Sequence, residues 1–164
     1  ALKAEKASRT VLCRIGLVLD KNEGALDKLT TPFKLFVGGS IGSGEQWMSW
    51  IHIEDLANLI VFLIENDECR GAFNCTAPNP VKMKHFAEDL GDALYRPSFF
   101  KVPSFALKML MGESAGMLLA SQRVVPDKAL EKGFKFRFSE LKPALIDLLR
   151  KPNPEDLQPK PIPK

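Results

Sequence analysis

The sequence predicts an α/β fold, in which a sheet carries a pocket at its loops and a smaller α+β unit follows. Residues 10–19 (TVLCRIGLVL) are β-branched and apolar on both faces, which is typical of a strand buried in a parallel sheet. Residues 54–66 carry apolar side chains at helical spacing from Leu56 to Ile64, so they predict a helix with one core-facing stripe. A strand at 72–76 and an amphipathic helix at 82–95 follow. Because strands and helices alternate, we expect a parallel sheet.

Shorter segments fill the rest of the chain. Turn, capping and alternation patterns predict, in order, a helix at 25–29, strands at 33–37 and 99–102, helices at 103–111, 115–119 and 127–131, a half-buried strand at 134–138, and a last helix capped by Ser139. Residues 151–164 hold five of the twelve prolines and no aromatic residue. They predict a disordered or polyproline-like tail.

Composition narrows the class of protein. A chain of 164 residues with 45% hydrophobic residues can bury the core of one domain, with or without a small extension. The net charge of +3 comes from scattered Lys and Arg residues rather than a basic stripe, which speaks against nucleic-acid binding. No apolar run reaches the roughly 18 residues that a membrane-spanning helix needs.

Three features of the sequence indicate whether the protein holds a metal and in which compartment it lies: its cysteines, its histidines and its first ten residues. Three cysteines without a Cys-x-x-Cys pair speak against a disulfide framework and for buried thiols in a reducing compartment. Two histidines speak against a metal site. Residues 1–10 are polar, lack Met and resemble neither a signal peptide nor a natural start. We therefore expect a later part of a cytoplasmic protein, or of an organelle-lumen protein whose targeting segment lies upstream.

The candidate pocket wall lies where a Gly-rich loop leads into the helix at 54–66. Trp47 could stack on a ligand ring, whereas Trp50 suits the core equally well. His52 either donates a proton or hydrogen bond to substrate or ties the loop to the helix start, and the second interpretation is favoured. Asp55 is expected to accept backbone hydrogen bonds at the helix terminus. The loop itself, residues 42–44 (GSG), is a weak phosphate-binding pattern.

Two arginines are candidates for binding an anion. Arg14 interrupts an apolar strand, so its charge either meets a carboxylate or reaches a ligand phosphate, and the sequence leaves both open. Gln122 and Arg123 could present a fork of donors to an anionic ligand, or could lie on a solvated surface. No catalytic residue emerges: there is no Gly-x-x-Gly-x-x-Gly loop, and Tyr95 is followed four residues later by Phe99, which excludes a Tyr-x-x-x-Lys pair.

Several short motifs occur together in order along the chain. They are residues 14–19 (RIGLVL), 38–44 (GGSIGSG), 50–57 (WIHIEDLA), 73–74 (FN), 77–81 (APNPV), 102–103 (VP), 111–113 (MGE), 122–126 (QRVVP) and 133–136 (GFKF). Together they resemble the later half of an extended short-chain dehydrogenase/reductase of the NAD-dependent epimerase/dehydratase type. The closest resemblance is to its atypical "epimerase family" subgroup. Two positions depart from the family pattern: Leu17 replaces an Asn common in sugar-nucleotide epimerases, and Glu45 replaces an Arg common in the subgroup.

The resemblance implies the C-terminal part of a Rossmann-like NAD(P)-binding fold plus a small α+β substrate domain. Residues 1–150 would form the substrate-side half, with 97–150 as the subgroup-specific domain. NADP or NAD would be bound mostly by an N-terminal half upstream of Ala1, which also holds the catalytic groups. The cofactor-binding residues implied for this chain are Arg14, Ile15 and Gly16. The substrate-pocket residues, taken from the motifs and the resemblance together, are Gln46, Trp47, Trp50, His52, Gln122 and Arg123.

The sequence is compatible with three functions. The first is an NAD(P)-dependent oxidoreductase or epimerase-like enzyme, with a small-molecule substrate and the chain's own N-terminal half as partners. The second is a non-catalytic nucleotide-binding or scaffold protein on a degenerate dehydrogenase fold. The third is an interaction domain that uses the proline-rich tail as a peptide ligand. A homo-oligomer is compatible with all three, and the Glu45 and Leu17 departures favour the second.

Overall fold

The structure is a computed structural model that describes residues 9–21, 24–102 and 121–150. The elements, in order, are β1 (Val11–Ile15), β2 (Leu17–Leu19), α1 (Ala25–Lys34), β3 (Gly39–Ile41), β4 (Trp47–Met48), β5 (Trp50–His52), α2 (Ile53–Glu65), β6 (Gly71–Cys75), β7 (Val81–Lys82), α3 (Met83–Leu94), β8 (Phe100–Val102), α6 (Asp127–Glu131) and α7 (Leu141–Leu149). The expected helices at 103–111 and 115–119 and the tail at 151–164 lie outside the described residues.

The strands form short pairs rather than one long sheet. Parallel pairs join β1 to β6, β2 to β5 and β3 to β8, and an antiparallel pair joins β4 to β7. The strand expected at 10–19 is therefore two strands that change partner at Gly16. Gly16 N–H donates to the Cys75 carbonyl at 3.2 Å, and the next N–H, on Leu17, donates to Ser49 at 2.8 Å. This change of partner opens the sheet at the residues predicted to lie beside the cofactor.

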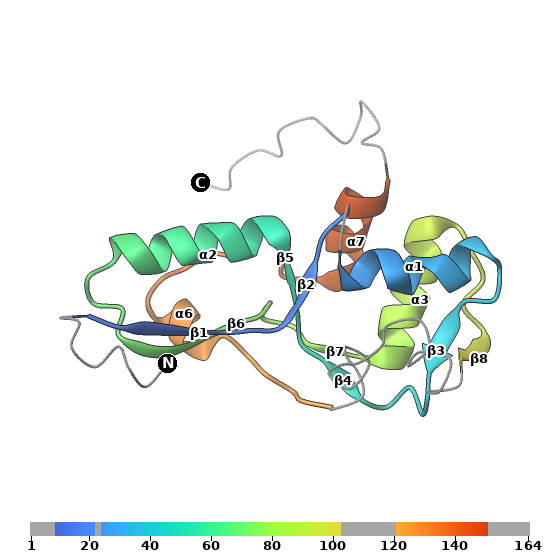
Figure 1. Ribbon diagram of the computed structural model, residues 1–164, viewed down its shortest axis with the longest axis horizontal. Helices are drawn as coiled ribbons and strands as arrows, with labels where there is room; N and C mark the ends of the chain where they lie inside the picture. The colour runs from blue at the N-terminus through green and yellow to red at the C-terminus, as the bar shows by residue number, and fades with distance from the viewer. Residues whose placement is uncertain (1–8, 22–23, 103–120, 151–164) are drawn as a thin grey trace, which may run out of the picture.

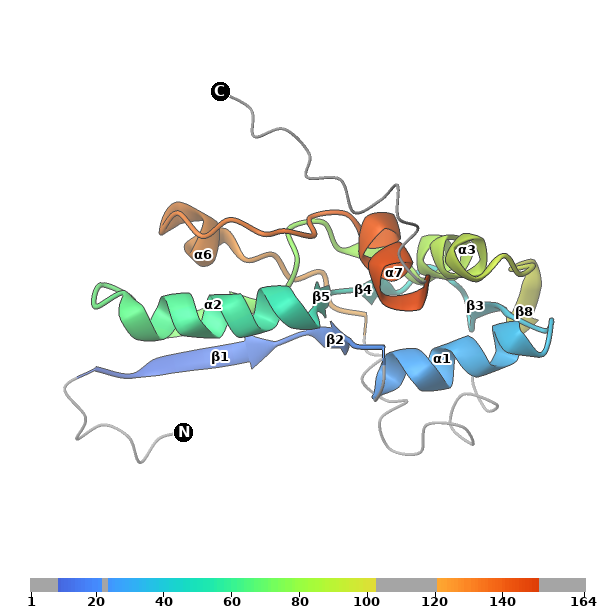
Figure 2. The same ribbon diagram turned by 90° about the horizontal axis from the view of Figure 1, so that it is seen from above.

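Two hydrophobic clusters hold the elements together. Figure 1 shows α2, β1, β6 and α6 at one end of the molecule and α1, α3, β3 and β8 at the other, with β2 and β5 between them. At the first end, Leu56, Leu59 and Leu63 of α2 pack with Phe73 of β6. Ile64, which the sequence assigns to the same stripe, is instead 64% exposed. The other cluster joins α1, α3 and α7 (Figure 2).

Strand β1 is more exposed than the sequence predicts. Leu12 and Ile15 are 40% and 47% exposed, and Arg14 is also exposed. In the described part of the chain, β1 pairs on one edge only, with β6. Leu12 and Ile15 point to opposite faces of the strand, so both faces of β1 carry exposed apolar side chains, and one of its edges has no described partner.

The segment 33–37 is not a strand, which corrects the sequence prediction. Phe33 belongs to α1, which runs past Pro32 to Lys34. Leu26, Leu29 and Phe33 share one buried helix face, so helical packing outweighs the local apolar pattern. The strand after the turn is β3, at the first residues of the Gly-rich stretch.

The segment 134–138 alternates as predicted but forms no strand. Phe134 and Phe138 are buried while Lys135 and Arg137 are exposed. No described strand pairs with it, because the N–H groups of Arg137 and Phe138 donate to the Asp55 carboxylate instead. In the following helix, α7, the N-cap position is Glu140 rather than Ser139, and the Glu140 side chain makes no capping hydrogen bond.

Candidate functional site

A cavity of about 620 Å³ lies where β1 passes into β2. Six of the nine residues predicted for cofactor or substrate contribute to its lining: Arg14, Ile15, Gly16, Trp47, Gln122 and Arg123. They come from three parts of the chain, namely the β1–β2 crossing, the start of β4 and the segment before α6. The volume is in the range of ordinary small-molecule sites.

Residues 121–125, here called the strap, run along one side of this cavity and are held by side chains. Ser49 Oγ donates to the Gln122 carbonyl at 2.7 Å and accepts from Val124 N–H at 2.9 Å. Asn74 Nδ2 donates to the Val125 carbonyl at 3.0 Å, and Thr76 Oγ1 donates to the Val124 carbonyl at 3.3 Å. These bonds fix the backbone of the strap and so hold Gln122 and Arg123 at the cavity wall.

The sequence reasoning missed Ser49, Asn74 and Thr76 as site residues. A signal for two of them was present, because Asn74 and Thr76 are polar residues two apart at the end of an apolar strand. Such residues share one face, opposite to the buried Phe73 and Cys75. No local pattern could have indicated that this face meets a segment about fifty residues further along the chain.

The cavity lining carries two guanidinium groups and one carboxylate. The Arg14 side chain makes no hydrogen bond or ion pair with any described residue, so the structure does not give it the protein carboxylate that the sequence left open. Arg123 makes no ion pair in the described part of the chain, and its Cζ lies 5.4 Å from the centre of the Trp47 ring. Asp127 is the one acidic residue among the lining residues. An anionic ligand would therefore meet two cations that no described side chain neutralises.

Gln46, Trp50 and His52 do not line this cavity, contrary to the sequence expectation. The Gln46 amide is buried in its own loop, where Nε2 donates to the Ile41 carbonyl at 2.9 Å and Oε1 accepts from Ser43 Oγ. Trp50 is fully buried in the core, and its indole N–H donates to the Asn79 carbonyl at 3.0 Å. These two side chains therefore form the framework behind the site.

His52 caps helix α2, in agreement with the favoured interpretation. Its Nδ1 accepts from Glu54 N–H at 3.1 Å, so the proton of the neutral ring lies on Nε2. The ring is 1% exposed and stacks on Phe138 at 4.0 Å between centroids. Nε2 lies 3.4 Å from a carboxylate oxygen of Asp147 but without hydrogen-bond geometry. The side chain thus joins α2 to the C-terminal segment.

Burial of His52 predicts a pH dependence of stability. Burial lowers the pKa of His52 below its usual value, and the nearby Asp147, Glu54 and Asp55 carboxylates oppose that shift without cancelling it. A group with a lowered pKa in the folded state stabilises the fold above its unfolded pKa near 6.5, and this stability is lost as the pH falls. We expect the unfolding free energy to fall below pH 6.5 by at most about 1.4 kcal/mol per pH unit from this residue.

Chemical denaturation between pH 5 and 8 measures that slope. His52→Asn keeps a capping acceptor but does not titrate, so its slope in this window is expected to be shallower than that of the unaltered protein. Equal slopes for the two proteins would contradict the assignment to His52.

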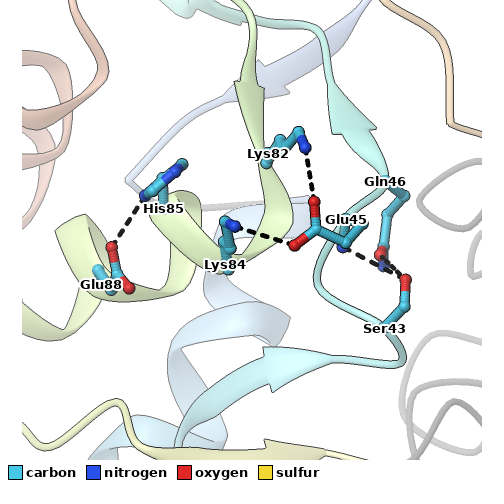
Figure 3. Close-up of polar contacts among 7 residues, drawn as sticks. All are labelled: Ser43, Glu45, Gln46, Lys82, Lys84, His85 and Glu88. Atoms are coloured by element: carbon cyan, nitrogen blue, oxygen red, sulfur yellow. Dashed lines mark hydrogen bonds and ion pairs between the residues drawn. The ribbon is translucent and has the colours of Figure 1, made fainter.

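Glu45, which stands where the subgroup commonly has Arg, is paired with two lysines in the fold. Its two carboxylate oxygens bind Lys82 Nζ at 2.5 Å and Lys84 Nζ at 2.9 Å (Figure 3). These two hydrogen bonds lower the pKa of Glu45 to about 2, so the side chain is ionised across the physiological range. The Glu45 charge is therefore neutralised by its neighbours.

Other reactive groups are few in the described part of the chain. Its three cysteines are free, and burial together with neighbouring Cys13 raises the pKa of Cys75 to about 12. That shift keeps the Cys75 thiol protonated and unreactive. Across residues 9–21, 24–102 and 121–150, no three His, Cys, Asp or Glu side chains converge on a metal position, and no helix is long and apolar enough to cross a membrane.

Comparison with known proteins places the chain in a family. Residues 26–76 match the model of the NAD dependent epimerase/dehydratase family, and residues 102–148 match a domain of unknown function, DUF1731. The Arabidopsis thaliana "Epimerase family protein SDR39U1 homolog, chloroplastic" is 49% identical over 150 residues, which is 92% of this chain and 43% of that protein. The chain spans about half the length of the curated relatives it matches.

Solved structures agree with this assignment. The crystal structure of human epimerase family protein SDR39U1 (isoform 2) with NADPH matches with a TM-score of 0.79 and 38% identity, over 86% of this chain and 48% of that one. A nucleoside-diphosphate sugar epimerase from Corynebacterium glutamicum matches with a TM-score of 0.66 and 28% identity, over 86% of this chain and 26% of that one. Both confirm the predicted Rossmann-like architecture. In sequence and fold, the chain matches the NAD-dependent epimerase/dehydratase family of short-chain dehydrogenases/reductases over about half the length of its relatives.

Proposed function

We propose that this chain is the C-terminal, substrate-side portion of an NAD(P)-dependent oxidoreductase or epimerase-like enzyme. The observation that carries the proposal is the 620 Å³ cavity, because residues predicted for the cofactor and residues predicted for the substrate line it together. The human relative that contains NADPH supports a nicotinamide cofactor of this kind. The Gly-rich loop and the acid-base residues would lie in a preceding N-terminal half.

The lining residues fit these roles chemically. Gly16 lets the β1–β2 crossing lie close against Ser49 and Thr76, because a Cβ at this position would meet the Ser49 carbonyl oxygen at 2.5 Å. Arg14 offers an unpaired charge on the same wall, and Trp47 with Arg123 offers a ring and a guanidinium to the substrate. The nicotinamide, when bound, would supply or accept the hydride. The residues of this chain would orient the substrate, exclude water and hold its anionic group.

The exposed outer side of β1 supports an N-terminal half as the partner of this chain. Leu12 and Ile15 expose apolar surface on a strand that has one described neighbour. A further parallel strand on the free edge would pair with its backbone groups, and the rest of an N-terminal half could then cover these side chains. Free thiols suit a reducing compartment, and we place the protein in the cytoplasm or, as the name of the plant relative suggests, in an organelle.

Calorimetric titration of the full-length protein with NADPH and NADH tests the proposal. We expect binding of at least one of them, with the affinity reduced about tenfold by Arg14→Met, which removes the charge but keeps a long side chain. Lys34→Met is the control, because Lys34 pairs with Asp27 on the surface away from the cavity. Absence of binding to both nucleotides would reject the proposal. Binding without turnover on a panel of ketones, alcohols and sugar nucleotides would instead favour a non-catalytic protein.

A further inference from the structure

Three charged side chains lie beside the substrate end of the cavity but do not line it: Lys82, Lys84 and Glu45. Lys82 is the cross-strand partner of Trp47 in the β4–β7 pair, so the two side chains project from the same face. Lys82 Nζ lies 5.9 Å from the centre of the Trp47 ring, and Arg123 Cζ lies 5.4 Å from the same centre. The Trp47 ring thus adjoins two positive charges, of which Arg123 alone lines the cavity.

Of the two cations beside Trp47, Glu45 pairs with Lys82 but not with Arg123. It holds Lys82 and Lys84 together, whereas Arg123 forms no ion pair with a described residue. The loop that carries Glu45 is firmly placed: Gly44 accepts from Lys84 N–H and Gln46 accepts from Met83 N–H, both at 2.9 Å. Glu45 N–H also donates to Ser43 Oγ (Figure 3). The carboxylate is therefore held between the lysines by the backbone as well as by its own charge.

We propose that Glu45 sets the charge of the ligand that this end of the cavity accepts. By engaging Lys82, it leaves Arg123 as the one available cation beside Trp47, which suits a group with a single negative charge, such as a carboxylate. A phosphate monoester carries nearly two negative charges. It gains less binding free energy there than it would beside two free cations. The inference rests on the proposed function, since it specifies the substrate class for that same cavity. Glu45 acts through Lys82 and is a positioning residue.

The role of Glu45 can be measured with two matched probes, phenylacetate and phenyl phosphate, which present the same ring with one or about two charges. Titration calorimetry of the full-length protein at pH 8 keeps the phosphate nearly doubly ionised. Glu45 is fully ionised there as well, because its pKa is about 2. Glu45→Gln keeps the size of the side chain but releases Lys82. We expect phenyl phosphate to bind about fivefold more tightly and phenylacetate about twofold, because the coulombic gain scales with ligand charge.

Three further variants separate this effect from a general structural one. Lys82→Met is expected to be nearly silent alone and to abolish the gain of Glu45→Gln when the two are combined. Glu88→Gln, which disrupts the His85–Glu88 pair one helical turn further along α3, is the matched control and is expected to leave both affinities unchanged. The gain should also shrink when the salt concentration rises from 50 to 300 mM.

Several outcomes would overturn the inference. They are an equal change for both probes, no change with Glu45→Gln, a gain that survives Lys82→Met, or no binding of either probe to any variant. NADPH titration of the same samples distinguishes these results from a failure of the proposed function. Intact NADPH binding alongside any of them would reject the role of Glu45 and leave the cofactor assignment in place.

Discussion

Replacing Asp55 with alanine is expected to lower the unfolding free energy by about 3 kcal/mol. The Asp55 carboxylate is 1% exposed and accepts from Arg137 N–H at 2.8 Å and from Phe138 N–H at 2.9 Å. The carboxylate therefore accepts the hydrogen bonds that a neighbouring strand would accept if segment 134–138 lay in a sheet. Alanine would leave both N–H groups without that acceptor and would also leave a small cavity at the first turn of α2.

Urea denaturation of the full-length protein measures this loss. Asp67→Ala is the control, because the Asp67 side chain is 98% exposed and its one ion pair with a described residue is the contact with Arg9, at 3.8 Å. A surface change of this kind is expected to cost less than about 0.5 kcal/mol. If both variants lost equally little stability, the Asp55 carboxylate would not be what holds segment 134–138 in place.

Replacing Gly16 with alanine is expected to weaken cofactor binding at least tenfold and to cost about 3 kcal/mol of stability. An added Cβ would meet the Ser49 carbonyl oxygen at 2.5 Å and Thr76 Cγ2 at 2.8 Å. The same Ser49 carbonyl accepts from Leu17 N–H, so relief of the clash would disturb the β2–β5 pair. Because Ser49 and Thr76 also hold the strap, the disturbance would reach both walls of the cavity.

Ile15→Val is the control for Gly16→Ala, since it alters the neighbouring cavity residue without adding atoms. Ile15 is half exposed and loses only one methyl group, so this change is expected to leave stability almost unaltered and to weaken NADPH binding far less than Gly16→Ala does. NADPH titration and urea denaturation of both variants provide the comparison. Wild-type affinity in Gly16→Ala would show that the β1–β2 crossing does not form the cofactor side of the cavity.

The regular elements could be predicted from sequence because their signals are local. The stripe in α2, the helix at α3 and the strand at β6 each show a clear period and clear ends, and the structure confirms them. Cavity residues such as Arg14 and Arg123 were also found, because an unpaired charge in an apolar context is visible in the sequence.

The errors share one physical cause, which is contact between segments far apart in the chain. The β1–β2 crossing at Gly16 depends on which strands lie on either side, and nothing within residues 10–19 specifies them. Segment 134–138 has the alternation of a strand, but its hydrogen bonds go to Asp55, about eighty residues earlier. The two ion pairs of Glu45 likewise could not be predicted, because Lys82 and Lys84 approach it only in the folded chain.

The central claim is that one cavity of this chain receives both the nicotinamide and the substrate. A crystal structure of the full-length protein with NADPH tests it most directly. We predict that the nicotinamide ring lies against Arg14, Ile15 and Gly16 and leaves the part of the cavity near Trp47 and Arg123 open for substrate. A nicotinamide bound on another face of the sheet, with this cavity empty, would contradict the claim.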